Sequence, residues 1–415
     1  MKNKKHFFFL SILTGLILKL IISFFTYHPD TKALQMAATV ISQNNLWFTL
    51  YDYIPRLPSN HPLLSQYGPE VMNYPPMAYW FQAIWHKLTS FLISPQTNTQ
   101  FIFTSNLPLN TYNFNWLLLI FKLKYIFFDA GIAYLIFKLT KQNQTLSLIW
   151  WLNPFTLYAT YMMGQFDIIP LFFAFLAYYT ITKHKNLYLA SFWLGMGGAF
   201  KIFPLLFLPF ITAYAKSVKK QLTTFIIGLT TYFLPSLPFI HSYGYKTYAL
   251  IASQTDKIFN TKIMLTGSQY LSLFLLSYTL LFTLHYLKPK NLNFTFFSIM
   301  ALFFAFVHFH PQWIIFIIPW TILLYHFKPN PKITNILTIL SCLYLLIVLS
   351  FDTSLNINLF TPLWGSPPTT STQPPLFFIN QFYSFHDFVS LIRTIWAGIL
   401  LALILIFNSL NAKQT

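Results

Sequence analysis

The sequence has only eight acidic residues among 415, and charged residues of both signs make up 8% of it. So few charges cannot cover the surface of a soluble domain, particularly with 55% apolar residues. The single cysteine, Cys342, excludes a disulfide framework and a cysteine-based metal site. Arginine occurs twice, and the many lysines are scattered between apolar runs, which excludes the basic stripe of a nucleic-acid-binding protein despite a net charge of +18. The composition predicts an all-α polytopic membrane protein, with residues 1–415 forming one integral membrane domain.

The apolar runs predict about twelve transmembrane helices, with both termini cytoplasmic because the lysine clusters then fall on the inner side. The first run resembles a secretory signal, but it is about 20 residues long and no small-residue cleavage site follows, so we expect a retained helix. The Lys-rich, Arg-poor usage favours a bacterial plasma membrane. The expected helices cover residues 7–27, 116–137, 146–163, 168–182, 187–200, 202–215, 221–240, 268–287, 292–307, 312–327, 333–350 and 388–408.

Two outer segments are much longer than the usual connection of about 4–6 residues. The first, 28–115, contains an apolar stretch at 77–93 that we expect to be an interfacial or re-entrant helix, because a crossing there would move every later lysine cluster outside. The second, 351–387, includes a Pro- and Thr-rich stretch at 366–375. It is either a solvated spacer or a flap over a site.

Asp30 stands directly after the first apolar run, where a membrane enzyme would keep a general base. The alternative is that Asp30 is the N-cap of a helix that begins at Thr31. Asp52, Glu70 and Asp256 are the reserve candidates for a base.

The four short helices between residues 146 and 215 predict sunken outer turns, because about 14 helical residues rise only about 21 Å across a core about 30 Å thick. Asp167 and Lys201 fall in two of these turns. A lone ion at that depth costs roughly 2.5–3.5 kcal/mol, so both side chains are expected to line a wet cavity and to pair. A purely structural ion pair is the alternative.

A third cluster of polar residues, His308, His310 and Gln312, follows the run 292–307. A zinc site is not favoured because no third ligand stands at a recognisable spacing, whereas hydrogen bonding to an anion suits these side chains. Arg393, in the outer turn of the last helix, has the fork that binds phosphate, or it anchors the helix at the membrane interface.

Four motifs together resemble the GT-C glycosyltransferases that use lipid-phosphate sugars, near their mannosyltransferase-like, polyprenol-phosphate-mannose-dependent members. The motifs are His28-Pro29-Asp30, Asn73-Tyr74-Pro75-Pro76, Asn153-Pro154 followed by Gly164-Gln165-Phe166-Asp167, and Lys201 with Pro204 and Pro209. They cover the chain from 28 to about 210, and His310-Pro311-Gln312-Trp313 is a looser likeness. Many relatives carry a second acid where this chain has Lys32, so a divalent metal is not supported by a carboxylate pair, and no cofactor is implied.

The resemblance implies an inverting transfer of one sugar, mannose or another hexose, from a polyprenyl-phosphate donor to a lipid, glycan or protein acceptor at the outer face. One base suffices because phosphate leaves without a proton, whereas a glycosidase needs two carboxylates. Asp30 is then the base. The donor phosphate would be held by Lys201, His310 and Arg393, and the substrate positioned by Gln165, Asp167, Tyr74, Gln312 and His308. A lipid-linked glycan ligase or polymerase, a secondary transporter and a non-catalytic scaffold stay open as alternatives.

Overall fold

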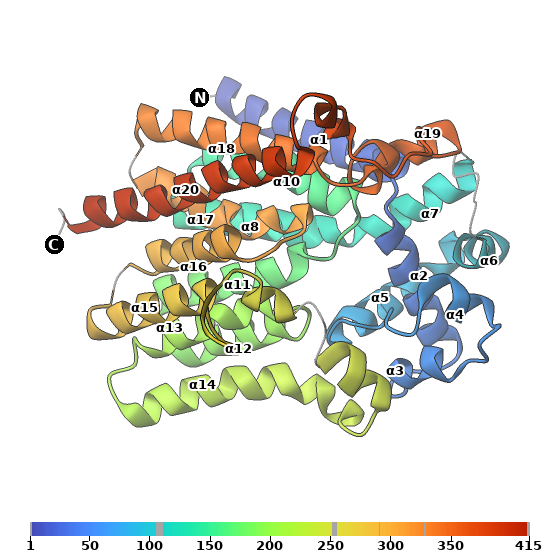
Figure 1. Cartoon of the computed structure of the whole chain (residues 1–415), viewed down its shortest axis with the longest axis horizontal. Coiled ribbons are helices and arrows are strands. Elements are labelled where there is room, and N and C mark those ends of the chain that lie inside the picture. Colours follow the sequence, from blue (N-terminus) through green and yellow to red (C-terminus); the bar gives the residue numbers. More distant parts are fainter. Residues whose placement is uncertain (1, 105–110, 251–254, 290, 328, 413–415) are drawn as a thin grey trace.

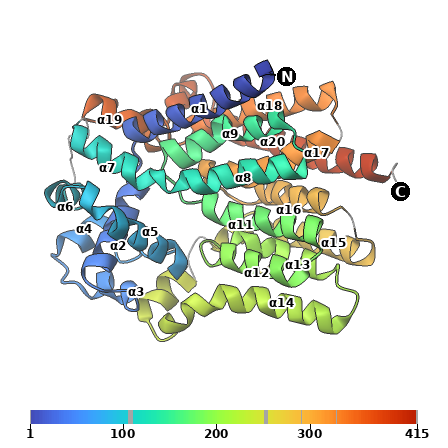
Figure 2. The ribbon, with the colours of Figure 1, turned by 180° about the vertical axis from the view of Figure 1, so that it is seen from behind.

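The computed structural model describes residues 2–104, 111–250, 255–289, 291–327 and 329–412. Long helices lie side by side in a bundle with both chain ends at one end, and a group of short helices covers the opposite end (Figures 1 and 2). The bundle helices are α1 (Lys2–Phe25), α7 (Tyr112–Leu123), α8 (Tyr125–Leu139), α9 (Gln144–Trp151), α11 (Ile168–Tyr179), α12 (Leu187–Gly198), α13 (Leu208–Thr212), α14 (Val218–Phe233), α15 (Leu273–Leu287), α16 (Leu292–Phe306), α17 (Ile318–Phe327), α18 (Pro331–Leu349) and α20 (Phe385–Ala412). The protein is an all-α membrane protein, as its composition predicts.

Each of the twelve expected ranges contains a helix, but four helices in the described part of the chain are long and apolar enough to cross a membrane by themselves. These four are His6–Phe25, Val218–Phe239, Pro331–Leu349 and Phe385–Ser409. Breaks in the helical backbone shorten the helices in the other expected ranges. After α9, for example, Asn153 caps a new start, α10 (Pro154–Thr156), which continues into the π-helical η3 (Leu157–Met162) because proline cannot extend the preceding helix. The count of twelve spans stays a prediction.

The long segment 28–115 folds into short helices at the end of the bundle away from the chain termini, with residues 105–110 outside the described part. They are α2 (Pro29–Gln43), α3 (Leu50–Tyr53), η1 (Ile54–Arg56), α4 (Pro62–Tyr67), α5 (Pro76–Thr89), η2 (Ser90–Leu92) and α6 (Pro95–Phe103). Helix α5 packs along α2 and covers most of the expected interfacial stretch 77–93. Buried Gln35 joins these helices, since its amide reaches His86 at 3.1 Å and Asn98 at 2.8 Å.

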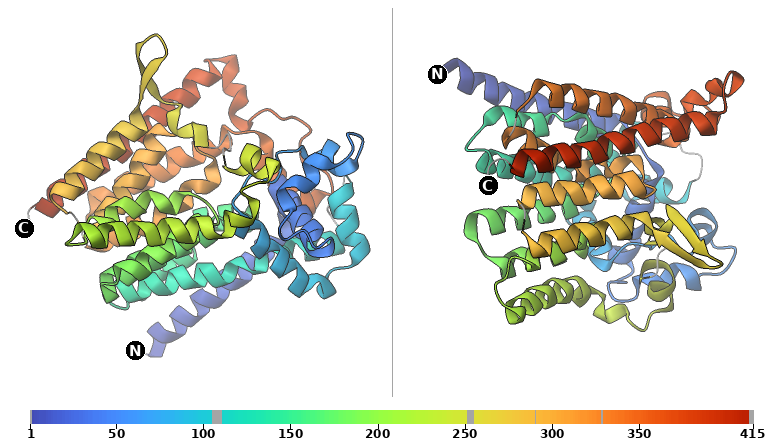
Figure 3. Two further views of the ribbon diagram at one scale, coloured as in Figure 1. Left: turned by 90° about the horizontal axis from the view of Figure 1, so that it is seen from below. Right: turned by 60° about the vertical axis from the view of Figure 1, so that its left-hand side comes forward.

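The structure corrects the helix predicted from residue 268. A hairpin of β1 (Lys262–Thr266) and β2 (Gln269–Ser272) precedes α15 and projects from the end of the bundle (Figure 3). Gly267 adopts φ +47° in the turn, a conformation that glycine reaches without strain. The side chain of Ser272 then caps α15 by accepting from the Leu275 N–H at 3.4 Å. The segment 268–272 is Ser-Gln-Tyr-Leu-Ser and is not apolar, and the glycine turn before it favours a hairpin, so the helix begins at Leu273 rather than at residue 268.

A fully buried ion pair joins α1 to α8. The Lys19 ammonium lies 2.7 Å from the Asp129 carboxylate, and both side chains are inaccessible to solvent. Asp129 also accepts hydrogen bonds from Trp150 Nε1 at 2.8 Å and the Tyr161 hydroxyl at 2.7 Å. Such a network is what lets a charge persist at this depth, since each charge alone is costly there.

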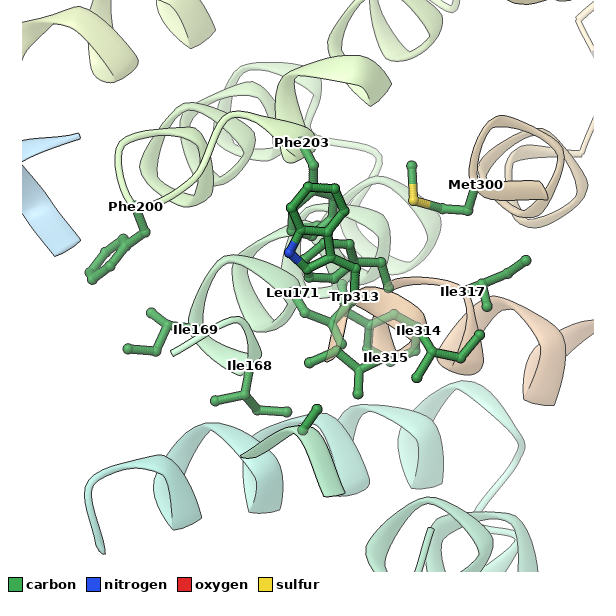
Figure 4. Close-up of a cluster of buried hydrophobic side chains, with 14 of the residues drawn as sticks. Ile168, Ile169, Leu171, Phe200, Phe203, Met300, Trp313, Ile314, Ile315 and Ile317 are labelled. Carbon is green, nitrogen blue, oxygen red and sulfur yellow. The ribbon is translucent and has the colours of Figure 1, made fainter. Parts of the chain in front are cut away.

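A buried apolar cluster fixes the elements beneath the short helices that cover one end of the bundle. Figure 4 shows side chains of α11, α16, η5 (Phe203–Phe207) and η9 (Pro311–Phe316) meeting in this cluster. The rings of Phe203 and Phe316 stack with centroids 3.8 Å apart. Close packing, rather than exclusion of water, holds such a contact inside a membrane. The cluster sets η9 against η5, and this contact places Trp313 beside Lys201.

Candidate functional site

Two cavities meet where the short outer helices join the bundle. The first, which we call the polar cavity, has a volume of about 400 Å³ and is lined by residues of α2, the segment 67–79, the turn at Gln165, the segment 310–313 and the segment 352–355. The second, the apolar cavity, has a volume of about 310 Å³ and is walled mainly by aliphatic and aromatic side chains of the segments 202–206, 249–250, 257–258 and 303–316. Asn73, Tyr74 and Trp313 line both. An amphiphilic ligand would therefore find a polar and an apolar compartment side by side.

Asp30 opens into the polar cavity from the first turn of α2. It is not the N-cap of this helix, which corrects that alternative: His28 is the cap, and its Nδ1 accepts from the Asp30 N–H at 3.2 Å. The side chain of Asp30 is 46% exposed, so its carboxylate is accessible from the cavity. Because Nδ1 accepts a bond and burial lowers the pKa of His28, this imidazole is neutral.

The turn at Gly164-Gln165 docks on the first turn of α2. Gln165 is buried and donates through Nε2 to the Asp30 carboxylate at 2.5 Å, while the Thr31 hydroxyl donates to the Met163 carbonyl at 3.2 Å. Gly164 has φ +70°, and a Cβ there would lie 2.6 Å from the Thr31 hydroxyl oxygen. Only glycine suits both the conformation and the close approach. The turn therefore orients the carboxylate of Asp30.

Lys201 and Asp167 form the ion pair that their positions in the sequence predicted, between the Lys201 ammonium and Asp167 Oδ1. The carboxylate is completely buried, and its second oxygen, Oδ2, has no hydrogen-bond partner. Lys201 lines the apolar cavity rather than the polar one. Its ammonium lies 5.0 Å from the centroid of the Trp313 ring and 5.6 Å from that of Tyr74, at the wall that the cavities share.

A second lysine, Lys257, lies at the same wall and was missed from the sequence. It belongs to η8 (Thr255–Phe259), lines the apolar cavity, and places its Nζ 5.4 Å from the centroid of the Trp313 ring. Its Nζ is also 2.8 Å from Nε2 of His310. The two partners are 53 residues apart in sequence, and no spacing signal connects them.

The contact with Lys257 sets the protonation state of His310. An ammonium group has no acceptor, so Nε2 of His310 must accept from Lys257 and the imidazole must be neutral. Burial and the charges of Lys257 and Lys201 lower the pKa of His310 to about 4. His310 lines the polar cavity as a neutral imidazole, which offers one N–H donor but no charge to an anion, so its predicted role as a phosphate ligand stays a prediction.

Of the remaining predicted residues, Tyr74 and Gln312 reach the site and His308 and Arg393 do not line it. Tyr74 stands between the two cavities, and buried Gln312 lines the polar cavity with its Oε1 lacking a hydrogen-bond partner. His308 is exposed and lines neither cavity. Arg393 lies over the ring of Phe309 at 4.5 Å and also lines neither. We therefore leave Arg393 and His308 out of the site.

The reserve carboxylates differ in position. Glu70 lines the polar cavity. Asp52 is engaged elsewhere, because its Oδ1 accepts from the Ser242 hydroxyl at 2.8 Å and from the Gly244 N–H at 2.9 Å. Asp256 is exposed and lines neither cavity.

The second outer loop, 351–387, also contributes to the site. Asp352 lines the polar cavity, and its carboxylate accepts from the Ser354 N–H at 3.0 Å. The loop is packed in place, since the Leu359 carbonyl accepts from the Tyr27 N–H at 2.8 Å. Its first turn is therefore part of the cavity wall rather than a solvated spacer. In the described residues, no group of three His, Cys, Asp or Glu side chains is arranged to hold a metal ion.

No protein-family model matches the chain. Over 100 residues it is 28% identical to GPI mannosyltransferase 1 of Candida albicans (strain SC5314 / ATCC MYA-2876). The aligned stretch covers 24% of this chain and 25% of that protein's length, so the match spans about a quarter of each. Over this stretch, the chain is similar to a mannosyltransferase.

Proposed function

We propose that the protein is a membrane glycosyltransferase of the GT-C type that moves a single sugar, mannose or another hexose, from a polyprenyl-phosphate donor to a hydroxyl of a lipid, glycan or protein at the outer face. The observation that carries this proposal is the shared wall at Asn73, Tyr74 and Trp313, which joins a polar cavity containing Asp30 to an apolar cavity containing Lys201. The similarity to a mannosyltransferase supports the same class of reaction.

The two compartments match the parts of such a donor. The prenyl chain would lie in the apolar cavity, whose lining is mostly aliphatic and aromatic, and the sugar in the polar cavity. Its phosphate would then sit at the shared wall, near the ammonium of Lys201. Gln312, with a buried oxygen lacking a partner, would accept a hydrogen bond from a sugar hydroxyl.

We expect the transfer to invert the configuration of the anomeric carbon. Asp30 lines the polar cavity and Lys201 the apolar one, so a base and a cation would face the anomeric carbon from opposite sides. The acceptor oxygen attacks C1, its proton passes to Asp30, and the bond between C1 and the phosphate oxygen breaks. The phosphate leaves with one more negative charge than the donor carried, and a fixed cation beside it stabilises that developing charge in the transition state.

The Asp30→Asn variant tests this assignment. Membranes containing wild type, Asp30→Asn or the control Asp256→Asn are supplied with labelled polyprenyl-phosphate sugars, and transfer to endogenous acceptors is measured at equal amounts of folded protein. We expect transfer by wild type and by the control, since Asp256 is exposed and outside both cavities. Loss of a general base should slow Asp30→Asn about 10²- to 10⁴-fold.

Three other outcomes would contradict parts of the proposal. Undiminished transfer by Asp30→Asn would move the base to Glu70, the reserve acid that lines the polar cavity. Transfer only from oligosaccharides on a diphosphate lipid would make the protein a ligase or polymerase. Movement of an intact solute across the membrane without a new glycosidic bond would make it a transporter.

A further inference from the structure

The charges at the wall between the cavities do not balance. The ammonium of Lys201 is neutralised by Asp167, with which it forms an ion pair. Lys257 has no such partner: within the described residues no carboxylate lies within ion-pairing distance of its Nζ. Its contact at 2.8 Å is with the neutral His310. Of the two lysines at the wall, Lys257 is therefore the one whose charge is surplus, in that no contacting carboxylate of the described residues offsets it.

This surplus charge is expensive where it stands. Lys257 is half-buried, and burial together with the nearby charge of Lys201 lowers its pKa. A partly desolvated cation without a counter-ion destabilises the protein, and a bound anion removes that penalty. The ammonium groups of Lys201 and Lys257 lie 5.0 and 5.4 Å from the centroid of the Trp313 ring. An anion beside this ring would therefore be close to both.

We infer that Lys257 is a binding residue for the phosphate of the lipid donor and that His310 positions its ammonium group. The inference rests on the proposed function and deepens it. The physical reason is that a phosphate beside Lys257 would supply the counter-charge that this half-buried ammonium group lacks in the described contacts.

Binding of short lipids to the purified full-length protein in nanodiscs tests the inference. The probes are farnesyl methyl phosphate, which is a diester with one charge, and uncharged farnesol, and titration calorimetry gives the Kd of each. We expect Lys257→Gln to weaken binding of the diester about 10- to 100-fold, the range of a charge-assisted hydrogen bond, and to leave farnesol binding unchanged. Unchanged farnesol binding also shows that the variant folds.

Matched variants separate charge from position. Lys262→Gln, at an exposed lysine whose ammonium lies over Tyr270 on the hairpin, should bind the diester as wild type does. Lys257→Arg should restore most of the affinity. For His310, we expect His310→Gln to retain the affinity because its amide oxygen accepts from Lys257, and His310→Leu to raise the KM for the donor without a matching fall in kcat.

The inference about Lys257 and the proposed function would be contradicted by different results. Equal diester affinity in wild type and Lys257→Gln would overturn this inference while leaving sugar transfer by the wild type, and hence the proposed function, intact. Absence of transfer from any polyprenyl-phosphate sugar by the wild type would overturn the proposed function, and this inference with it.

Discussion

Replacing Lys201 with methionine removes the partner of a completely buried carboxylate, and two readouts should respond differently. In the wild type, Asp167 Oδ1 bonds to Lys201 and Oδ2 has no partner, so the substitution leaves both oxygens without a hydrogen bond. Removing one member of a buried ion pair costs about 3–5 kcal/mol. Replacing both members, as Lys201→Met with Asp167→Asn, should restore most of that free energy of unfolding because no uncompensated charge remains.

Steric trapping in bicelles measures the unfolding free energy of the two single variants and the double variant, and the transfer assay measures their activity. If Lys201 holds the donor phosphate, the double variant regains stability but not transfer. Full transfer by the double variant would refute that role and leave the pair purely structural, which is the alternative that the sequence left open. A loss below about 1 kcal/mol in the single variant would refute the burial argument itself, since exposed ion pairs have that magnitude.

Two further predictions concern pH and backbone conformation. The pKa of His310 is about 4 in the folded protein against 6.5 in the unfolded chain, so its contribution to stability is complete above pH 6.5 and is lost as pH falls toward 4. After allowance for partial exposure, the loss in the free energy of unfolding is about 1–2 kcal/mol. Thermal unfolding measured between pH 7 and 4.5 should show the wild type losing stability relative to His310→Gln. Parallel plots of stability against pH for the two proteins would contradict this prediction. Gly164→Ala should destabilise the protein by about 1–3 kcal/mol and reduce transfer, because φ is +70° and the new Cβ would meet the Thr31 hydroxyl. Gly398→Ala, where a Cβ meets nothing within 4 Å, is the control and should be neutral or slightly stabilising.

The sequence alone predicted features that follow from the small number of charged residues in this chain. Asp167 and Lys201 stood out because an isolated charge in an apolar environment needs a partner, and the structure pairs them. The same argument applied to Lys19 and Asp129, which were overlooked although each is a lone charge in an apolar run. All four residues are isolated charges in apolar surroundings and need a partner. The sequence therefore contained the information needed to predict the second ion pair as well as the first.

Other features depend on geometry that no local pattern contains. Lys257 and His310 come from segments with no shared spacing, and their contact exists only because the fold brings Lys257 of η8 beside the start of η9. The capping role of His28 was missed because an aspartate two residues later fits the usual N-cap preference better. The hairpin at 262–272 was assigned to a helix in part because its last residues, 268–272, directly precede the apolar helix that begins at Leu273, and hydropathy does not fix where such a helix starts.

The ion pair between Lys19 and Asp129 has a consequence for synthesis of the chain. Asp129 is made about 110 residues after Lys19, which is a delay of roughly 5–20 s at ordinary translation rates. During that interval the unpaired charge of Lys19 disfavours insertion of α1 into the bilayer by about 2.5–3.5 kcal/mol. The first helix therefore gains its counter-charge only when α8 arrives beside it, and a nascent chain stalled before residue 129 should leave α1 easier to extract from the bilayer than a chain stalled after it.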